Sequence, residues 1–460
     1  MDTNEKRLRV PKRILNTLLT SLSAGVVPRS GAPYIAIGRQ AEINAFMESL
    51  DAVAEGGAAV RFLIGRYGSG KSFLTQLVRG YALEKGFLTA DADLSPERRL
   101  SGSNHTGLAT YRELIRNLAC RTAPEGGALP IVLSRFLDTL RHKLAEQGVM
   151  PEDDNYSLRL RQEAYRALSG LEEGVGGFDF ATVLGAYLTA VIDEDEEKKL
   201  ACLRWLRGEY TVKTEARLAM RIPVTSVIDD NNWYDILKLW AQLSVRLGYR
   251  GFAVFVDECV NLYKIPNRIS REANYEKILS IFNDALQGRA AYLGVFFCGT
   301  PQFLEDTRRG LFGYEALRSR LADTRFNQLG YVNYSSPVIR LRVLSENELL
   351  ALLARLTSLY AEKTAKEEAL TPDQMVRFLS AAMARTGSGE MMTPRELIRD
   401  YLGILTILDE HPEVDFDALL SAGVGEMSAA PLPPSAEADT PFTGEVGGTK
   451  KVFTLADIEI

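Results

Sequence analysis

Gly65-Arg66-Tyr67-Gly68-Ser69-Gly70-Lys71-Ser72 is the stretch that decides the fold of this chain, because it has the spacing G-x-x-x-x-G-K-[ST] of a phosphate-binding loop, or P-loop. Its glycines allow the backbone to pass close to a polyphosphate and to turn its N–H groups toward the anion. Lys71 can reach the β- and γ-phosphates, and the Ser72 hydroxyl can ligate Mg²⁺. The sequence therefore predicts a nucleoside triphosphate site.

The residues on either side have the form that a P-loop requires. The apolar run over residues 58–65 is typical of a buried parallel strand, and residues 73–79 have helical spacing. The loop would then open a helix whose N-terminus favours anions. We expect the nucleotide to be bound by Gly65, Tyr67, Gly68, Ser69, Gly70, Lys71, Ser72 and Phe73.

The composition is that of an ordinary globular protein, and it excludes several classes. The chain has 460 residues and a net charge of −6, so it is not a basic nucleic-acid binder as a whole. No apolar run reaches the length of a membrane span, and the charged N-terminus does not resemble a signal peptide. The four cysteines lack CxxC spacing and there are three histidines, which argues against a disulfide framework or a zinc site. These features predict a cytoplasmic protein without membrane contact.

Strand patterns recur along the chain and alternate with helical patterns. After residues 58–65, strands are expected at 86–91, 251–258, 292–300 and 338–342. This alternation predicts an α/β fold with a five-stranded parallel sheet. From residue 345 onward the pattern is helical, and three helix starts have capping-box spacing. They are Ser345 with Glu348, Thr371 with Gln374, and Thr393 with Glu396.

Asp257 and Glu258 end the apolar run at 251–258, which is the Walker B arrangement. Asp257 would hold Mg²⁺, through water or together with Ser72. Glu258 is placed to polarise the attacking water as a general base, which indicates hydrolysis rather than the reaction of a P-loop kinase. The alternative for the two carboxylates is a plain surface turn.

Three further positions are candidates for the catalytic site. Thr300 ends the strand predicted at 292–300 and could orient the water or sense the γ-phosphate; the alternative is an ordinary turn threonine. Arg318 and Arg320 cannot share one helix face, so one of them could reach a nucleotide in a neighbouring subunit. Arg395 follows a capped helix start and could lie over the phosphates. For the arginines the alternatives are surface salt bridging and a solvated first-turn side chain.

Together these motifs resemble an AAA+ ATPase of the initiator and transposition-regulator branch. Gly38-Arg39-Gln40-Ala41-Glu42 is similar to the Gly-Arg-x-x-Glu box of that branch, which helps to form the adenine pocket, so the resemblance adds Gly38 and Arg39 to the expected nucleotide contacts. Residues 299–301 resemble its sensor 1, 317–320 its arginine-finger segment and 393–397 its sensor 2. The expected cofactors are ATP and Mg²⁺, and the expected metal ligands are Ser72 and Asp257. The expected catalytic residues are Lys71, Glu258, Thr300, Arg318, Arg320 and Arg395.

A closer resemblance is to the BrxD-type ATPases of BREX phage-exclusion systems, and the related ATPase of the Shango defence system is an equally good candidate. It is carried by residues 25–39, 92–100 and 314–321. The resemblance implies an ATPase of bacterial antiphage defence that forms a homo-oligomer (a ring or a filament), associates with DNA and accompanies a DEAD/DEAH-type helicase.

The distance along the chain between Lys71 and Asp257, 186 positions, departs from a minimal AAA+ core and predicts a large helical insertion. Its basic residues, interleaved with Trp205 and Tyr210, could contact nucleic acid; a protein-docking or structural role is the alternative. The predicted domains are an N-terminal basic arm and helix (1–34), a discontinuous AAA+ P-loop core (35–104 and 246–343), the helical insertion (105–245), a C-terminal helical lid domain (344–426), and a flexible tail with a terminal docking segment (427–460).

Two hypotheses for the function follow. The first is an oligomeric, DNA-dependent ATPase of a defence system, in which hydrolysis changes the angles of lid and subunits and so the affinity for DNA or a partner. The second is a slow nucleotide-gated scaffold or loader that recruits a helicase without remodelling DNA directly. Glu258 argues against a scaffold that cannot hydrolyse ATP, but not against a slow one.

Overall fold

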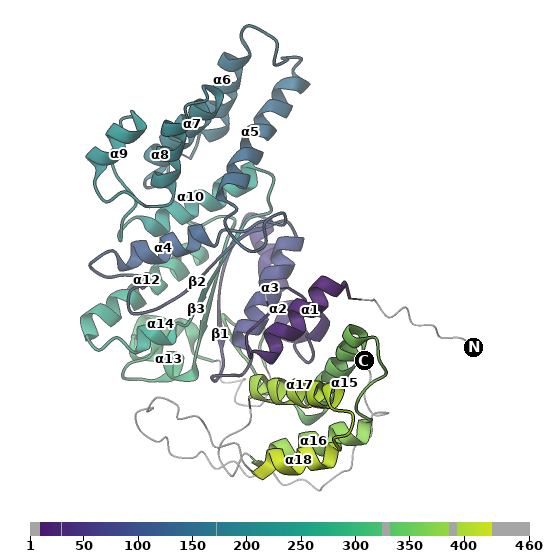
Figure 1. Ribbon diagram of the computed structural model, residues 1–460. Helices are drawn as coiled ribbons and strands as arrows, with labels where there is room; N and C mark the ends of the chain where they lie inside the picture. The colour runs from purple at the N-terminus through teal and green to yellow at the C-terminus, as the bar shows by residue number, and fades with distance from the viewer. Residues whose placement is uncertain (1–9, 29, 172, 324–331, 386–392, 426–460) are drawn as a thin grey trace. The chain divides into compact units, whose positions relative to one another are not determined.

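Two compact units make up the computed structural model, which describes residues 10–28, 30–171, 173–323, 332–385 and 393–425 (Figure 1). The sheet unit comprises Ala41–Arg66 and Leu77–Leu341. The terminal unit comprises the described parts of Met1–Gln40, Tyr67–Gln76 and Arg342–Ile460. Most of the predicted N-terminal basic arm, and the predicted tail with its docking segment, lie outside the described residues.

The sheet unit is built on five parallel strands in the order β2-β3-β4-β1-β5, which confirms the predicted α/β class and parallel sheet. The strands are β1 (Ala58–Ile64), β2 (Leu88–Asp93), β3 (Phe252–Asp257), β4 (Leu293–Gly299) and β5 (Val338–Arg340). β1 pairs with β4 along its whole length, and its second half also pairs with β5. β4 and the residues of β3 before Asp257 are buried on both faces, which explains their continuous apolar runs.

Within the described residues, seven α-helices follow β2 and precede β3 in the chain, where the sequence predicts a mostly helical region. They are α4 (Thr106–Arg116), α5 (Leu129–Glu146), α6 (Tyr156–Leu168), α7 (Gly177–Ile192), α8 (Glu196–Leu206), α9 (Lys213–Met220) and α10 (Trp233–Arg246). In Figure 1, α4 and α10 lie next to the sheet and α5–α9 lie beyond them. Buried residues of the sheet and of these helices belong to one apolar cluster. That the helices are an insertion into a shorter core stays a prediction.

The other helices of this unit flank the strands in the chain. α2 (Gln40–Ala54) precedes β1. α3 (Lys71–Glu84) follows the P-loop, and its residues up to Gln76 belong to the terminal unit. The segments after β3 are α11 (Val260–Tyr263), α12 (Arg268–Leu286), α13 (Pro301–Glu305), the 3-10 helix η2 (Leu311–Gly313) and α14 (Glu315–Leu321). The described helices include none that is both long enough and apolar enough to cross a membrane.

The terminal unit packs the first helix of the chain against the last ones. Its elements are α1 (Lys12–Ser23), the 3-10 helix η1 (Ala32–Ile35), α15 (Glu346–Thr364), α16 (Pro372–Arg385), α17 (Pro394–Glu410) and α18 (Phe416–Gly425). The buried leucines of α1 join those of α15 and α17 in one apolar core. Inside this core, the hydroxyls of Thr357 and Tyr401 share a hydrogen bond of 2.5 Å.

All three predicted capping boxes are present in the terminal unit. Ser345 and Thr393 each accept a hydrogen bond from the N–H three residues on, and Glu348 and Glu396 accept one in return. Thr371 and Gln374 make the same reciprocal pair at the start of α16. Each box satisfies N–H groups that a helix start leaves without intrahelical partners, and this is why the helices begin where the sequence predicts.

Candidate functional site

The P-loop continues β1, and most of it belongs to the terminal unit. Gly65 still belongs to the sheet unit, where its N–H donates to the carbonyl of Gly299 at the end of β4 (3.1 Å). Gly68 (φ 74°) and Gly70 (φ 93°) have left-handed backbones that residues with a Cβ rarely adopt, which explains the glycines there. Lys71 then begins α3, so the loop opens a helix as predicted.

The first turn of α3 is anchored in the terminal unit. Phe73 packs against the apolar core of that unit, whereas Tyr67, on the other side of the loop glycines, is 75% exposed. Lys71 and Ser72 lie between them in the chain and are half-buried. Phe73 thus packs in the core of the terminal unit, and the nucleotide contact that the sequence predicts for it stays a prediction.

The start of α17 lies against the P-loop. A Cβ atom at Gly68 would lie 2.4 Å from Cγ2 of Thr393, the residue that caps α17, so a glycine is needed for the two segments to meet. The guanidinium of Arg395 lies 5.9 Å from the centroid of the Tyr67 ring, within range of a cation–π contact. The terminal unit therefore brings Arg395 to the P-loop, while its contact with the phosphates stays a prediction.

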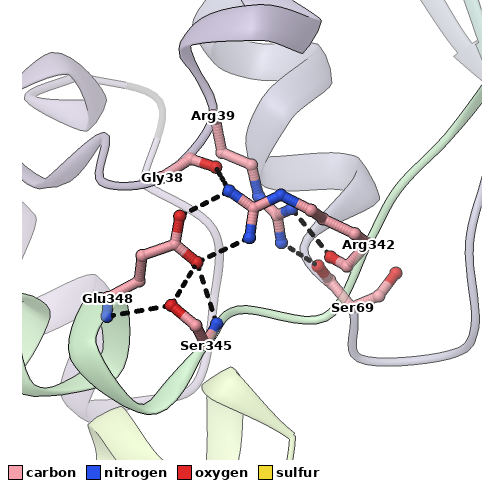
Figure 2. Close-up of polar contacts among 6 residues, drawn as sticks. All are labelled: Gly38, Arg39, Ser69, Arg342, Ser345 and Glu348. Carbon is pink, nitrogen blue, oxygen red and sulfur yellow. Dashed lines mark hydrogen bonds and ion pairs between the residues drawn. The ribbon is translucent and has the colours of Figure 1, made fainter. Parts of the chain in front are cut away.

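Arg39 reaches the P-loop from the segment before α2. Its side chain is buried, with only 4% of the residue exposed. Nη1 donates to the carbonyl of Arg342 (2.7 Å) and Nη2 donates to the carbonyl of Ser69 (3.3 Å), as Figure 2 shows. The preceding residue, Gly38, has φ 71°, and a Cβ there would lie 2.4 Å from a carboxylate oxygen of Glu348.

Arg342 and Glu348 were not predicted as site residues, yet they complete this group of contacts. Arg342 donates to the carbonyl of Gly38 (3.0 Å) and pairs with both carboxylate oxygens of Glu348. The hydrogen bond from Arg342, helped by the N–H and hydroxyl of Ser345, lowers the pKa of Glu348 to about 2. The sequence identified Glu348 through its capping box alone, because nothing in the spacing reveals that Arg342 turns back toward it.

Acidic side chains gather at the carboxyl edge of the sheet. Asp93, the last residue of β2, is in register with Asp257, the last residue of β3. The surrounding protein, and then the carboxylates of Asp257, Asp91 and Glu258, raise the pKa of Asp93 to about 6. The sequence analysis missed Asp93 because it expected the second strand to stop at residue 91; the residue's position at the strand end was the signal.

Glu258 has a backbone that is strained for its residue type. Its φ is 55°, in the left-handed region, and its N–H donates to Oδ1 of Asp257 (2.7 Å). This conformation costs a residue with a Cβ roughly 1–2 kcal/mol, and strained residues cluster at functional sites. The side chain itself is exposed. Six other non-glycine residues of the described chain have a similar positive φ, so a chemical task for Glu258 stays a prediction beside the plain surface turn.

Thr300 combines a structural contact with the predicted position after β4. Its Oγ1 accepts a hydrogen bond from the N–H of Phe303 (3.3 Å), so it caps α13. The ordinary task of a turn threonine is therefore present. The hydroxyl remains a donor when its oxygen accepts, so this cap leaves the predicted contact with water or phosphate open.

Arg318 and Arg320 are exposed on α14. Arg320 donates to the carbonyl of Ala316 (2.7 Å), and neither arginine forms an ion pair with any residue in the described ranges. Surface salt bridging, the alternative for these arginines, is not found in this part of the chain. Which of the two would reach a neighbouring subunit stays a prediction.

The sequence analysis allowed the helices between β2 and β3 to contact nucleic acid through basic and aromatic residues. The aromatic part of this prediction is wrong. Trp205 and Tyr210 are each only 1% exposed, so neither ring can stack on a base. Several of the basic residues are already paired: Arg161 with Asp193, Arg204 with Glu215 and Arg207 with Glu209, while Arg217 donates to the carbonyl of Val224. Arg159 and Lys213 are exposed.

The predicted site residues divide between the two units. The terminal unit holds Gly38, Arg39, Tyr67, Gly68, Ser69, Gly70, Lys71, Ser72, Phe73 and Arg395. The sheet unit holds Gly65, Asp257, Glu258, Thr300, Arg318 and Arg320.

The predicted Mg²⁺ ligands, a hydroxyl on Ser72 and a carboxylate on Asp257, supply the oxygen donors that this ion prefers. In the described part of the chain, no group of three or more His, Cys, Asp or Glu side chains could hold a metal ion by itself. This donor set fits Mg²⁺, which is usually bound through one or two carboxylates together with substrate phosphates. When bound, the ion would neutralise phosphate charge.

Comparison with known families gives a match over nearly the whole chain. The family described as BREX system ATP-binding protein BrxC/D matches residues 10–423. A comparison with curated proteins found no match.

Replacing Glu258 by glycine should relieve the strain at φ 55°. We expect Glu258→Gly to have a free energy of unfolding about 0.5–1 kcal/mol above that of Glu258→Gln, which keeps a Cβ, because glycine tolerates this conformation. Urea denaturation of both variants measures the difference. An equal or lower stability of the glycine variant would show that the backbone at this position is not strained.

Asp93→Asn should change how stability depends on pH. The pKa of Asp93 is raised to about 6 in the folded protein, so the folded state binds the proton more tightly than the unfolded state and stability falls as the pH rises from about 4 to 6. Asparagine carries no titrating proton, so the variant does not lose this stability. The free energy of unfolding of Asp93→Asn relative to the parent should therefore rise from pH 5 to pH 8, by about 1 kcal/mol after allowance for solvent screening.

Urea denaturation at the two pH values measures this difference, with the exposed Asp138→Asn as the matched control. A difference that is the same at pH 5 and pH 8 would contradict the raised pKa of Asp93.

Proposed function

We propose that this chain, which belongs to the family of BREX system ATP-binding proteins BrxC/D, hydrolyses ATP to ADP and phosphate with Mg²⁺, and does so as an oligomer associated with DNA. ATP binding and the BREX system come with the family. Hydrolysis is what we add. The observation that carries it is the strained backbone that presents Glu258 directly after β3.

The phosphates would be bound at the P-loop and the start of α3. The left-handed glycines 68 and 70 shape the loop so that its N–H groups can point toward one anion, and the helix N-terminus adds its dipole. Lys71, the first residue of α3, would place its ammonium on the β- and γ-phosphates. Gly38 and Arg39 precede this site in the chain and support adenine as the base by resemblance.

Glu258 would take the proton of the attacking water while the water oxygen bonds to the γ-phosphorus and the bond to the ADP oxygen breaks. Its exposed carboxylate can accept this proton, and the hydrogen bond from its own N–H to Asp257 fixes the backbone that carries it. Thr300, after the neighbouring strand β4, would orient the water. Because parallel strands present their carboxyl ends at the same edge of a sheet, Glu258 and Thr300 follow their strands at the edge where β1 ends.

Two arginine positions support a site shared between copies of the chain. Arg318 and Arg320 are exposed and form no ion pair with a described residue, so either can serve a neighbouring nucleotide, where it would stabilise the charge of the transition state. Arg395 would act within its own chain, since it already contacts the Tyr67 ring of the P-loop.

A slow nucleotide-gated scaffold that recruits a helicase is the second candidate function. The observation that favours it lies on the helices between β2 and β3. There the aromatic residues Trp205 and Tyr210 are buried and cannot stack on bases, which removes the support that they gave to direct DNA contact. Under either function, the helicase of the same defence system is the proposed partner.

Lys71→Ala and Glu258→Gln separate binding from hydrolysis. We expect Lys71→Ala to lose ATP binding at least tenfold, because it removes the cation at the phosphates. Glu258→Gln should bind ATP normally and hydrolyse it at least about a hundredfold more slowly, because an amide cannot accept the proton. Isothermal titration gives the affinities, and phosphate release gives the rates, with the exposed Glu197→Gln as the control.

The same rates, and the mass of the assembly with ATP and Mg²⁺, are to be measured with and without duplex DNA. Parental hydrolysis by Glu258→Gln would refute the general base. A monomer whose ATP turnover ignores DNA would refute the oligomeric DNA-dependent ATPase and leave the scaffold.

Mixtures of inactive variants test the shared site. Arg318→Ala or Arg320→Ala should be inactive alone and regain activity when mixed with Lys71→Ala, because one copy then supplies the arginine and the other an intact P-loop. Steady-state turnover across mixing ratios measures the recovery. If no ratio of either mixture exceeds the sum of its components, the arginine is not supplied by a neighbour.

A further inference from the structure

The guanidinium of Arg39 donates hydrogen bonds to two main-chain carbonyls. Nη1 is bonded to the carbonyl of Arg342 and Nη2 to that of Ser69, while the residue as a whole is 4% exposed. Moving this buried guanidinium away from its two carbonyl acceptors would cost free energy, because its N–H groups would lose charge-assisted hydrogen bonds. Arg39 therefore belongs to the framework of the P-loop, whatever base the nucleotide carries.

The hydrogen bond from Arg39 to Ser69 bears on the orientation of the peptide between Ser69 and Gly70 in the P-loop. In a planar trans peptide the C=O of one residue and the N–H of the next point in opposite directions. With the Ser69 carbonyl turned toward Arg39, the N–H of Gly70 points away from Arg39. The peptide between Ser69 and Gly70 turns about ψ of Ser69 and φ of Gly70, and Gly70, which has no Cβ, restricts this rotation less than another residue would.

We propose that Arg39 is a positioning residue of the P-loop, which directs the N–H of Gly70 to the phosphate side by holding the carbonyl of Ser69. The positive charge beside the carbonyl also polarises the peptide and makes that N–H a stronger donor to an anion. The inference rests on the proposed function of the P-loop as a nucleotide site and assigns to Arg39 a task other than binding adenine.

Arg342 holds Arg39 in place by a reciprocal contact. Arg39 donates to the carbonyl of Arg342, and Arg342 donates to the carbonyl of Gly38, the residue before Arg39 (Figure 2). The two segments are thus tied twice, once in each direction. Rotation of the Arg39 side chain away from Ser69 would break the first of these hydrogen bonds.

Glu348 fixes Arg342 in turn. Its two carboxylate oxygens receive both terminal nitrogens of the Arg342 guanidinium, and Oε2 also accepts from the N–H of Ser345 (2.8 Å) in the capping box of α15. A bidentate pair of this kind fixes the plane of the guanidinium as well as its position. The contacts from α15 to Arg39 are therefore doubled at each step, and Arg39 extends them to the carbonyl of Ser69 by one hydrogen bond (3.3 Å).

A positioning role and an adenine contact for Arg39 predict different effects of its substitution on a ligand that has no base. We expect Arg39→Gln to weaken binding of ATP, GTP and inorganic tripolyphosphate by the same factor, about tenfold or more, and to leave the ratio of ATP to GTP affinity unchanged. Arg39→Lys, which keeps the charge, should lie between the parent and Arg39→Gln. Competition against a fluorescent ATP analogue, with the full chain, gives all three affinities.

The matched control is Arg355→Gln. Arg355 is a half-buried arginine of α15 that donates to a backbone carbonyl, that of Tyr34 (2.9 Å), and its removal should leave all three affinities unchanged. If Arg39→Gln does not fold, as judged by its thermal midpoint, Arg342→Lys replaces it, because it loosens the carbonyl that holds Arg39 and should weaken the three ligands equally.

The outcomes separate the two proposals. Unchanged tripolyphosphate affinity, or an altered ATP to GTP ratio, in Arg39→Gln would overturn the positioning task and favour an adenine contact. If the parent chain binds none of the three ligands, the proposed function fails as well.

Discussion

The pairing of β1 with a parallel strand on each side is the constraint on which the site depends. β4 pairs with all of β1 and β5 with its second half, so the chain must leave the sheet at Ile64 in one fixed direction. The hydrogen bond from Gly65 to Gly299 then ties the exit of β1 to the end of β4. Since the strands are all parallel, Asp257 and Thr300 leave the sheet at that same edge. The predicted site residues Asp257, Glu258 and Thr300 thus lie where strands end, and the rest of the sheet holds those ends in place.

The sequence predicted the parts of the fold that local rules decide. Buried parallel strands show as apolar runs, and all five were found, with ends displaced by at most a few residues. Capping boxes are local too, and all three were found. The family is also consistent with the P-loop and its flanks.

What the sequence could not provide were contacts between residues far apart in the chain. Asp93 was missed because Asp91 and Asp93 interrupt the apolar pattern that marks the strand, and only the register with β3 places Asp93 beside Asp257. The partners of Arg39 lie 30 and 303 positions away, and no spacing rule joins them. The predicted nucleic-acid contact of Trp205 and Tyr210 was wrong because both residues are buried. An aromatic residue among basic ones has the same local sequence pattern whether it faces solvent or the core.

The packing of α1 against α15 and α17 has a consequence for how the protein is made. The leucines that α1 buries are synthesised long before their partners on α15 and α17, so the apolar face of α1 has no native cover while the sheet unit is being translated. Thr393 and Arg342, which support the P-loop, also arrive late. A nascent chain that has not reached residue 342 therefore lacks both of these supports of the loop. A ribosome that stalls before residue 393 would leave a product that lacks the cap of α17 against Gly68.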